Sequence, residues 1–427
     1  LAAEEALKGN RVKAVIATSA LGMGFDKPDL GFVVHLGAPS SPVAYYQQVG
    51  RAGRATASAD VLLLPGPEDR AIWHYFATNA MPTQARADAV LAALREAGRA
   101  SVAALEARVD IRRSQLELLL RVLAVDGAVE YGAGGWSATG AQWTYDAERY
   151  SRIAAARQAE QESMVAYERL GTCRMRFLTA ALDDPHAADC GRCDVCAGGW
   201  FPTDIALPQA DRAKAELDRV GVPVAPRALW PTGVDRLGVR AEGAPLSGRI
   251  AASELVAEGR VLARLSDLGW GGPLRELFAP GPGGEPRDAD VPAELARACV
   301  RVLAGWDWAE RPAAVVAVPS LSRPLLVGAL ADGIARAGRL AHLPALTLAP
   351  GAGRLAASTN SAFRLRDLWG RFDVSPELAE ALAGLQGRPV LLVDDLVDSR
   401  WTMTVAGRLL RRAGAGPVLP FALASVG

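Results

Sequence analysis

Four of the five cysteines are grouped at a spacing that could bind a metal ion. They are Cys173, Cys190, Cys193 and Cys196, in the pattern C-x16-C-x2-C-x2-C. Four thiolates complete the tetrahedral shell of a structural zinc site, whereas a catalytic zinc site keeps one position open. Four buried reduced cysteines are the alternative, although close C-x2-C pairs are rarely explained by packing alone. His186 could replace one thiolate, but Pro185 and Ala187 beside it favour a loop. The pattern predicts structural Zn²⁺.

Two arginines near the amino terminus could act on phosphate. Arg51 and Arg54 are three residues apart and follow a helix that we expect to begin at Pro42. On a helix, that spacing places both guanidinium groups on one face. Guanidinium groups bind phosphoryl oxygens bidentately and stabilise the charge that develops in phosphoryl transfer, and nearby glycines allow close approach. An isolated pair of this kind is usually a solvated face, so the interpretation depends on its context.

A cluster of acidic and hydroxyl side chains follows an apolar strand near the carboxy terminus. Val390–Val393 is the strand, Asp394 and Asp395 form an acidic pair, and Asp398 and Ser399 lie in a short loop before a helix. This order places carboxylates that suit a ribose beside backbone N–H groups and a helix N-terminus that suit a phosphate. The remaining cysteine, Cys299, is expected to face a helical core without chemical function.

Composition limits how these groups can be used. A chain of 427 residues exceeds what one hydrophobic core usually serves, so we expect about two to four domains. Half of the residues are hydrophobic and 22% are charged, which excludes a wholly disordered protein. Lys plus Arg equals Asp plus Glu at 47 each, so nucleic-acid binding must use local patches. We find neither a run of eighteen apolar residues nor a secretory leader, and expect a soluble intracellular protein.

The patterns that position these groups predict a multi-domain α/β and α protein. Strands at Val12–Ala17, Phe32–Leu36 and Val61–Leu64 alternate with a helix opened by Ser41 and Pro42, which indicates half of an α/β domain. Residues 83–139 read as three helices and a hairpin, which suggests a winged helix with Arg112, Arg113, Gln115 and Arg121 available to DNA. The alternative is a helical packing module with solvated arginines. Residues 146–182 read as helical, and residues 279–292 as a linker.

Three further strands, at Ala313–Val318, His342–Leu348 and Val390–Val393, are separated by helices and predict a parallel α/β sheet. The expected domains are a partial RecA-like α/β lobe at 1–81, a winged-helix-like domain at 82–145 and a helical zinc-binding domain at 146–204. A connector of unassigned fold occupies 205–289, and an α/β domain occupies 290–427.

Two ordered segments resemble a known helicase family. Residues 17–28 and 45–54 closely resemble the last two helicase motifs of RecQ-family DNA helicases. The resemblance implies that Arg54 is the arginine finger, with Arg51 as its partner. It implies contact with the nucleotide for the residues Gln47, Gly24, Asp26, Gly50 and Gly53. Thr18, Gly22 and Gly24 would lie where the second motor lobe meets the DNA backbone or couples it to ATP. Residues 164–196 resemble the RecQ zinc-binding domain, with all four cysteines in register.

This resemblance implies the carboxy-terminal portion of an ATP-dependent DNA helicase of 3′ to 5′ polarity, acting in DNA repair and recombination. Its partners would be single-stranded and forked duplex DNA, with ATP and Mg²⁺ in the full-length protein, in the bacterial cytoplasm at the nucleoid. No lysine here follows Gly and precedes Ser or Thr, so the GxxxxGK[ST] phosphate loop is absent from this sequence. We therefore expect the chain alone to be inactive. RecQ proteins usually carry their winged helix after the zinc domain, whereas here the candidate comes before it.

Residues 390–402 resemble the phosphoribosyl pyrophosphate loop of type I phosphoribosyltransferases, and Ala313–Pro319 with Arg323 looks like their first strand and following loop. The resemblance covers roughly residues 290–427 and implies a site for phosphoribosyl pyrophosphate or a nucleotide. The implied contacts are Asp394, Asp395, Asp398, Ser399 and Thr402. Arg400 replaces a usual glycine, and Trp401 a usual small residue. A retained ligand site, a working transferase and a scaffold without ligand all remain open. As a whole, the chain could instead be a nucleotide-binding or regulatory module with a DNA-targeting appendage.

Overall fold

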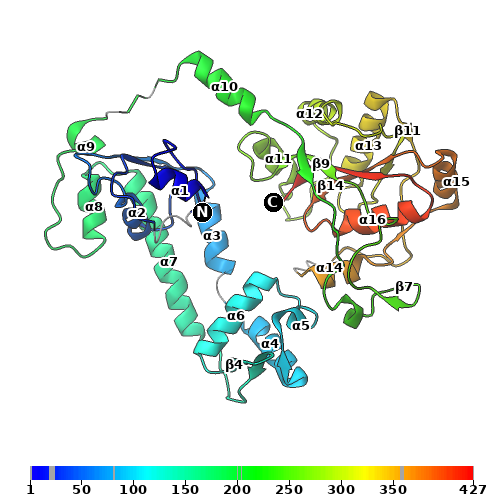
Figure 1. The fold of residues 1–427 in the computed structure, drawn as a ribbon, viewed down its shortest axis with the longest axis horizontal. Helices are drawn as coiled ribbons and strands as arrows, with labels where there is room; N and C mark the ends of the chain where they lie inside the picture. The colour runs from blue at the N-terminus through cyan, green and yellow to red at the C-terminus, as the bar shows by residue number, and fades with distance from the viewer. Residues whose placement is uncertain are drawn as a thin grey trace. The chain divides into compact units, whose positions relative to one another are not determined.

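The computed structural model describes residues 2–18, 25–79, 82–199, 201–202, 204–355 and 360–426. The chain divides into two compact units, one formed by Leu1–Gln84 with Gln142–Asp204 and the other by Ala85–Ala141 with Ile205–Gly427 (Figure 1). Within the described ranges, none of the helices has both the length and the apolar character that a membrane span requires. Each unit positions its own candidate sites.

The first unit begins with a small α/β arrangement. Helix α1 (Ala2–Lys8) is followed by strands β1 (Phe32–Leu36) and β2 (Asp60–Leu64), which pair in parallel and flank α2 (Pro42–Val49); α3 (Asp69–Asn79) follows. Ser41 caps α2, because its hydroxyl accepts a 3.1 Å hydrogen bond from the Ala44 N–H, and Pro42 occupies the first turn. The strands predicted at Phe32–Leu36 and Val61–Leu64 and the start of this helix are confirmed.

The predicted strand Val12–Ala17 is wrong. These residues are irregular, and Ile16 is 99% exposed. A β-branched sequence becomes a strand only when a neighbouring strand completes its hydrogen bonds. In the described part of the chain, β1 and β2 pair with each other and not with this segment.

Three more helices complete the first unit: α7 (Ala147–Glu168), α8 (Arg174–Ala180) and α9 (Asp194–Ala197). The helical stretch expected over 146–182 is thus two helices with a break after Glu168. Helix α7 packs on α2 and α3, and α8 also contacts α2. One apolar cluster joins them; its buried members are Ala38, Tyr45, Val49, Trp73, Met164, Tyr167 and Leu178. The helix that precedes Arg51 is therefore packed directly on the helices around the cysteines.

The second unit contains a small module of three helices and a three-stranded antiparallel sheet. Its elements are α4 (Gln84–Ala97), β3 (Arg99–Ala100), α5 (Val102–Glu106), α6 (Arg113–Val125), β4 (Val129–Gly132) and β5 (Gly135–Ala138), with strand order β3-β5-β4. Leu116, Leu119, Leu120 and Leu123 form the buried face of α6, at the spacing of an amphipathic helix. The predicted three helices and hairpin are confirmed. Trp136 of β5 packs against Tyr131, with ring centroids 5.1 Å apart.

The larger part of the second unit is a sheet of six strands in the order β11-β10-β14-β15-β9-β6. The strands are β6 (Val222–Val224), β9 (Gly259–Arg264), β10 (Ala314–Ala317), β11 (Ala341–His342), β14 (Val390–Val397) and β15 (Val418–Ser425). All neighbours are parallel except the edge strand β6. The parallel sheet was predicted, but His342–Leu348 divides into β11 and a separate β12 (Thr347–Leu348), which pairs with β13 (Phe372–Asp373).

Helices cover both faces of this sheet, as the alternation along β14 requires. Val390 and Leu392 belong to one core cluster, and Leu391 and Val393 to the other. The first cluster includes residues of α14 (Ser361–Leu368), α15 (Pro376–Gly384) and α16 (Trp401–Arg412). The second includes residues of α11 (Gly271–Phe278), α12 (Ala293–Ala304) and α13 (Pro324–Gly338), on the other side of the sheet (Figure 1).

The segment 205–289, for which the sequence indicated no fold, contributes to this sheet. It contains α10 (Leu207–Leu217), β6, the short helix η2 (Val234–Leu237), the hairpin β7 (Arg240–Ala241) and β8 (Ala244–Pro245), then β9 and α11. Strand β9 pairs with β15, and Glu254 forms a 2.8 Å ion pair with the buried Arg408 of α16. The sheet therefore extends across the boundary expected at residue 290. Residues 279–292 contain no helix or strand, as expected for a linker.

Candidate functional site

The arginine pair lies in a turn and not on a helix. Helix α2 ends at Val49, and Gly50 closes it by donating its N–H to the carbonyls of Tyr46 and Gln48. Gly53 has a φ of 77°, a backbone conformation that glycine adopts without steric cost. The expectation that Arg51 and Arg54 share one helix face is therefore wrong, because the glycines between and before them end the helix.

The turn nevertheless directs both guanidinium groups to consecutive residues. Arg51 donates to the carbonyl of Phe25 at 2.5 Å, and Arg54 pairs with the Asp26 carboxylate at 3.0 Å. Arg54 is 46% exposed and Asp26 is 71% exposed, so this ion pair contributes at most about 1 kcal/mol and can exchange its partner. A phosphate could replace the carboxylate of Asp26 at little cost.

Backbone hydrogen bonds hold the two segments together. Gly53 donates to the Leu30 carbonyl at 3.0 Å, and Ala55 donates to the Pro28 carbonyl at 2.8 Å. Lys27, which is 6% exposed, donates to Asn10 at 2.8 Å and to Asp29 at 2.5 Å. These hydrogen bonds from Lys27 and Asn10 lower the pKa of Asp29. Lys27 thus fixes the backbone beside Asp26, a role that sequence reasoning missed because it depends on contacts distant along the chain.

The other residues predicted to act in this region are Gln47, Thr18, Gly22 and Gly24. Gln47 is exposed on the last turn of α2, and Thr18 is exposed outside any helix or strand. Gly22 and Gly24 lie outside the described residues. The structure therefore brings together Arg51, Arg54, Gly50, Gly53 and Asp26.

The four predicted cysteines converge. The Sγ atoms of Cys173, Cys190, Cys193 and Cys196 all lie within 4.8 Å of one another, and Cys173 and Cys193 are 4.0 Å apart. Tetrahedral coordination with Zn–S bonds of about 2.3 Å requires sulfur atoms roughly 3.8 Å apart, so the group fits a zinc ion closely. His186 is not part of the group, and its backbone N–H bonds to Asp184 in the intervening loop. The cluster could therefore hold a metal through four thiolates.

Helix ends and an ion pair position these sulfur atoms. Cys173 caps α8, and its sulfur accepts hydrogen bonds from the backbone N–H groups of Arg176 and Cys190. Burial raises the pKa of the Cys173 thiol, but these N–H donors outweigh it, and the pKa is lowered. Arg174, beside Cys173, pairs with Asp194, beside Cys193, at 2.9 Å. This ion pair joins the two turns that carry the ligands.

The acidic pair near the carboxy terminus lies inside a strand. Strand β14 runs to Val397, beyond the expected Val390–Val393, so Asp394 and Asp395 lie within the strand and not after it. The two residues are 6% and 8% exposed. Asp395 pairs with Arg323 at 3.1 Å, and Asp394 accepts a 2.9 Å hydrogen bond from the Asp395 N–H. Burial, and then the charge of Asp395, raises the pKa of Asp394 well above its usual value.

The two departures from the phosphoribosyltransferase pattern have different structural consequences. Arg400 adopts a φ of 68°, where glycine is usual, and its side chain turns away to the Ala225 carbonyl at 3.0 Å. Trp401 is 1% exposed and stacks on Trp230, so its ring lies in the core and does not fill the loop. Arg227 donates to the Ser399 carbonyl at 2.8 and 3.0 Å, an interaction that sequence reasoning missed.

The remaining predicted loop residues are accessible. Asp398 is exposed, whereas Ser399 and Thr402 are half-buried. Burial, followed by repulsion from Arg400, lowers the pKa of Arg227, and Asp398 opposes this. The loop thus carries Asp398 and Arg400, and Arg227 contacts it through the Ser399 carbonyl.

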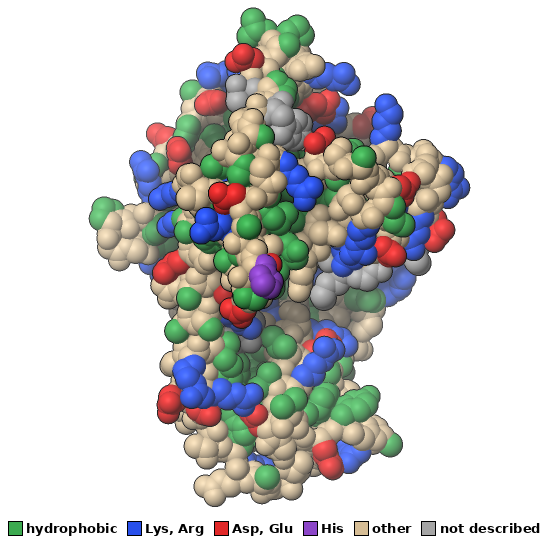
Figure 2. Space-filling model, turned by 90° about the vertical axis from the view of Figure 1, so that its left-hand side faces the viewer, with side chains coloured by type: hydrophobic (Ala, Val, Ile, Leu, Met, Phe, Trp, Pro, Cys, Tyr) green, Lys and Arg blue, Asp and Glu red, His purple; other side chains and the backbone are tan. Residues whose placement is uncertain are grey.

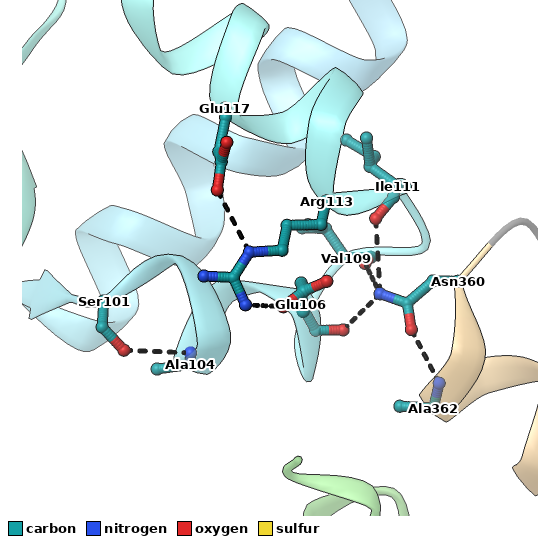
Figure 3. Close-up of polar contacts among 9 residues, drawn as sticks. All are labelled: Ser101, Ala104, Glu106, Val109, Ile111, Arg113, Glu117, Asn360 and Ala362. Atoms are coloured by element: carbon teal, nitrogen blue, oxygen red, sulfur yellow. Dashed lines mark hydrogen bonds and ion pairs between the residues drawn. The ribbon is translucent and has the colours of Figure 1, made fainter. Parts of the chain in front are cut away.

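The arginines proposed for DNA contact are at the start of α6. Arg112 is the N-cap residue, and Arg112 and Arg113 are both exposed. Arg113 pairs with Glu117 at 3.1 Å and with Glu106 at 3.6 Å (Figure 3). Across the face of the molecule drawn in Figure 2, basic and acidic side chains are interspersed. Contact of α6 with DNA would depend on Arg112 and on Arg113, which already pairs with two carboxylates.

Comparison with known protein families matches the segment that carries Arg51 and Arg54. The family model described as helicase conserved C-terminal domain matches residues 1–56. The ATP-dependent DNA helicase RecQ of Pasteurella multocida is 42% identical over 71 residues, which cover 17% of this chain and 11% of that protein. The Bacillus subtilis RecQ is 39% identical over 66 residues, with 16% and 11% covered. The ATP-dependent DNA helicase Q1 of Pongo abelii is 49% identical over 57 residues, with 13% and 9% covered.

The matched segments thus span about a tenth of these relatives. The range matched by the family model, residues 1–56, includes the turn that carries Arg51 and Arg54. The amino-terminal part of this chain is similar to the C-terminal region of RecQ helicases.

Proposed function

We propose that this chain is the carboxy-terminal portion of a RecQ-like, ATP-dependent DNA helicase that moves 3′ to 5′ on DNA. The observation that carries this proposal is the turn at Gly50–Arg54, which holds two guanidinium groups against Phe25 and Asp26 within the segment that matches helicases. Arg54 would exchange Asp26 for the terminal phosphate of ATP and stabilise the charge that develops there. Arg51 and Gln47 would assist from the same side.

ATP and Mg²⁺ would bind between this lobe and one that carries the phosphate-binding lysine. No GxxxxGK[ST] motif occurs in this sequence, so the chain alone supplies only the arginine side of such a site. We therefore infer that the chain by itself neither hydrolyses ATP nor unwinds DNA.

The cysteine cluster would bind one structural Zn²⁺ and brace the motor. Its helices α7 and α8 pack on α2, which immediately precedes the arginine turn. Tyr45 of α2 and Tyr167 of α7 are in contact, with ring centroids 5.3 Å apart. Zinc would hold α8 and α9 together and thereby keep α2 in place.

DNA would contact both units. Thr18 and Gly22 would meet the backbone of single-stranded DNA, and the module α4–β5 would act as a winged helix on forked duplex DNA through Arg112 and Arg113. The support is its order of elements and the exposure of both arginines at the start of α6. The alternative of a packing module predicts no loss of DNA affinity when both arginines are replaced by alanine.

The motor proposal is tested with the chain joined to the coding sequence upstream of it. Arg54→Ala in that protein should lower the turnover number for ATP by about a thousandfold while leaving ATP affinity within a fewfold, because an arginine finger acts on the transition state. Arg152→Ala is the control, since it removes an arginine from another exposed ion pair, with Glu148, on α7. DNA-stimulated ATP hydrolysis by the present chain alone, or an unaffected Arg54→Ala variant, would contradict the proposal.

A second candidate function is ligand binding in the α/β domain, as a phosphoribosyltransferase-like nucleotide-binding or regulatory module. The observation in its favour is the buried Asp394 and Asp395 pair, which precedes a loop with the backbone conformation expected for phosphate binding. Calorimetric titration with phosphoribosyl pyrophosphate and Mg²⁺ should release heat with the native chain and none with the Asp394→Asn, Asp395→Asn variant. Equal heats would leave a scaffold without ligand.

A further inference from the structure

Asn360 connects the small module α4–β5 to the α/β domain within the second unit. Its side chain caps α14 by accepting a 2.7 Å hydrogen bond from the Ala362 N–H. Its amide group also donates to the carbonyls of Glu106 at 2.7 Å and of Val109 and Ile111 at 3.3 Å (Figure 3). One buried residue, 5% exposed, thus satisfies a helix N-terminus and three carbonyls of a turn some 250 residues away.

The contact between the small module and the α/β domain also involves the Asn360 backbone and Gly233. The Asn360 backbone N–H donates to the Asp110 carboxylate at 2.8 Å. Gly233, at a φ of 78°, approaches the same turn so closely that a Cβ there would lie 2.2 Å from the Cβ of Ala107. A buried amide with all its donors and acceptors paired is a specific interaction, because any displacement leaves polar groups unsatisfied. We therefore treat residues 106–111 (the α5–α6 turn) as a docking site for the α/β domain.

The α5–α6 turn directly precedes the arginines proposed to contact DNA. Ile111 and Asp110 are one and two positions before Arg112. An α-helix with its side chains is about 10–12 Å across, and the major groove is about 12 Å wide. A helix that enters the groove by its leading end therefore leaves no space for a second domain at that end. Within the module itself, Arg113 is paired with Glu106 and Glu117, so Arg112 is the arginine at this end that forms no ion pair with a carboxylate among the described residues of the module.

We propose that the α/β domain and DNA compete for the leading end of α6, and that Asn360 holds the module in its DNA-excluding state. The competition rests on the proposed role of Arg112 and Arg113, whereas the docking contact does not. DNA that binds this end must first break the Asn360 contacts. The apparent affinity for DNA is therefore the affinity of the undocked module multiplied by the fraction of molecules that are undocked.

The variant Asn360→Asp separates the two roles of the residue. A carboxylate still accepts from Ala362 and caps α14, but it cannot donate to the three carbonyls, and it brings a second negative charge to Asp110. Ser375→Ala is the matched control, because Ser375 caps α15 of the same domain through the Leu378 N–H at 3.2 Å. Both variants are made in the whole chain, and hydrogen exchange and binding to a fluorescent forked DNA are measured.

Asn360→Asp should accelerate hydrogen exchange across residues 106–111 and tighten DNA binding by about tenfold, with neither effect in Ser375→Ala. Unchanged exchange would overturn the docking contact. Faster exchange with unchanged DNA affinity would overturn the competition, provided that Arg112→Ala, Arg113→Ala weakens DNA binding. If that double variant binds DNA with native affinity, α6 does not contact DNA and the proposed competition is wrong. Hydrogen exchange of residues 106–111 would still test the docking contact.

Discussion

Asp394 and Asp395 are adjacent in one buried strand, yet their electrostatic surroundings differ. The Asp395 carboxylate forms an ion pair with Arg323. Asp394 instead accepts a hydrogen bond from the Asp395 N–H and is repelled by the charge of the Asp395 carboxylate. Keeping a second carboxylate in such a place costs stability. The ligand site proposed at this end of β14 would account for such a cost.

The raised pKa of Asp394 predicts the direction in which stability changes with pH. The folded state keeps the Asp394 proton to higher pH than the unfolded state does, so this residue lowers stability as pH rises above about 4, the unfolded pKa. Asp394→Asn should therefore raise the free energy of opening of β14 by about 1–3 kcal/mol at pH 7 and by much less near pH 3. Native-state hydrogen exchange of the β14 amides measures this.

Asp395→Asn is the contrasting variant, because it leaves the half-buried Arg323 without its carboxylate partner. It should lower the same free energy by about 3 kcal/mol at pH 7. A stabilising effect of Asp395→Asn, or a destabilising effect of Asp394→Asn, would show that the charge is distributed differently between the two carboxylates.

Among the elements, the starts of helices were predicted better than their ends. Ser41 and Pro42 specify the start of α2 through local hydrogen bonding and a fixed φ, so the sequence was sufficient. The end of α2 at Gly50 changed the geometry of the arginine pair, although the pair still reaches one segment. Val12–Ala17 has the composition of a strand but no paired neighbour among the described residues. Strands β6 and β9 were missed because β9 pairs with the distant β15, and β6 pairs in turn with β9. The convergence of the four cysteines was predicted from their spacing along the chain.

The ion pair between α8 and α9 makes a prediction at this scale. Arg174→Ala should weaken Zn²⁺ binding by about 10-fold to 100-fold, because it frees the two ligand-bearing turns from each other. Competition with a chromophoric chelator measures the affinity. Arg176→Ala is the control, since Arg176 pairs with Asp189 at 3.6 Å on the exposed surface. Equal loss in both variants would show that the effect comes from charge and not from the link between helices.

For the whole molecule, a net charge of zero means that DNA binding cannot draw on a general field. If Arg112 and Arg113 each contact one phosphate, log affinity should fall with log salt concentration, and Arg112→Ala, Arg113→Ala should reduce that slope by about 1.8. Fluorescence anisotropy with duplex DNA over a salt series measures both slopes. A double variant with native affinity at low salt and an unchanged slope would exclude phosphate contact by this pair.

The position of β9 and β6 determines where a fragment of the C-terminal domain can begin. A fragment cut at residue 290, where the sequence alone suggests a boundary, would lose both strands and expose the backbone of β15 from Phe421 to Ser425. A bare edge of that kind recruits other chains, so such a fragment would aggregate and report false partners. Truncations that preserve the native sheet have to begin before Val222.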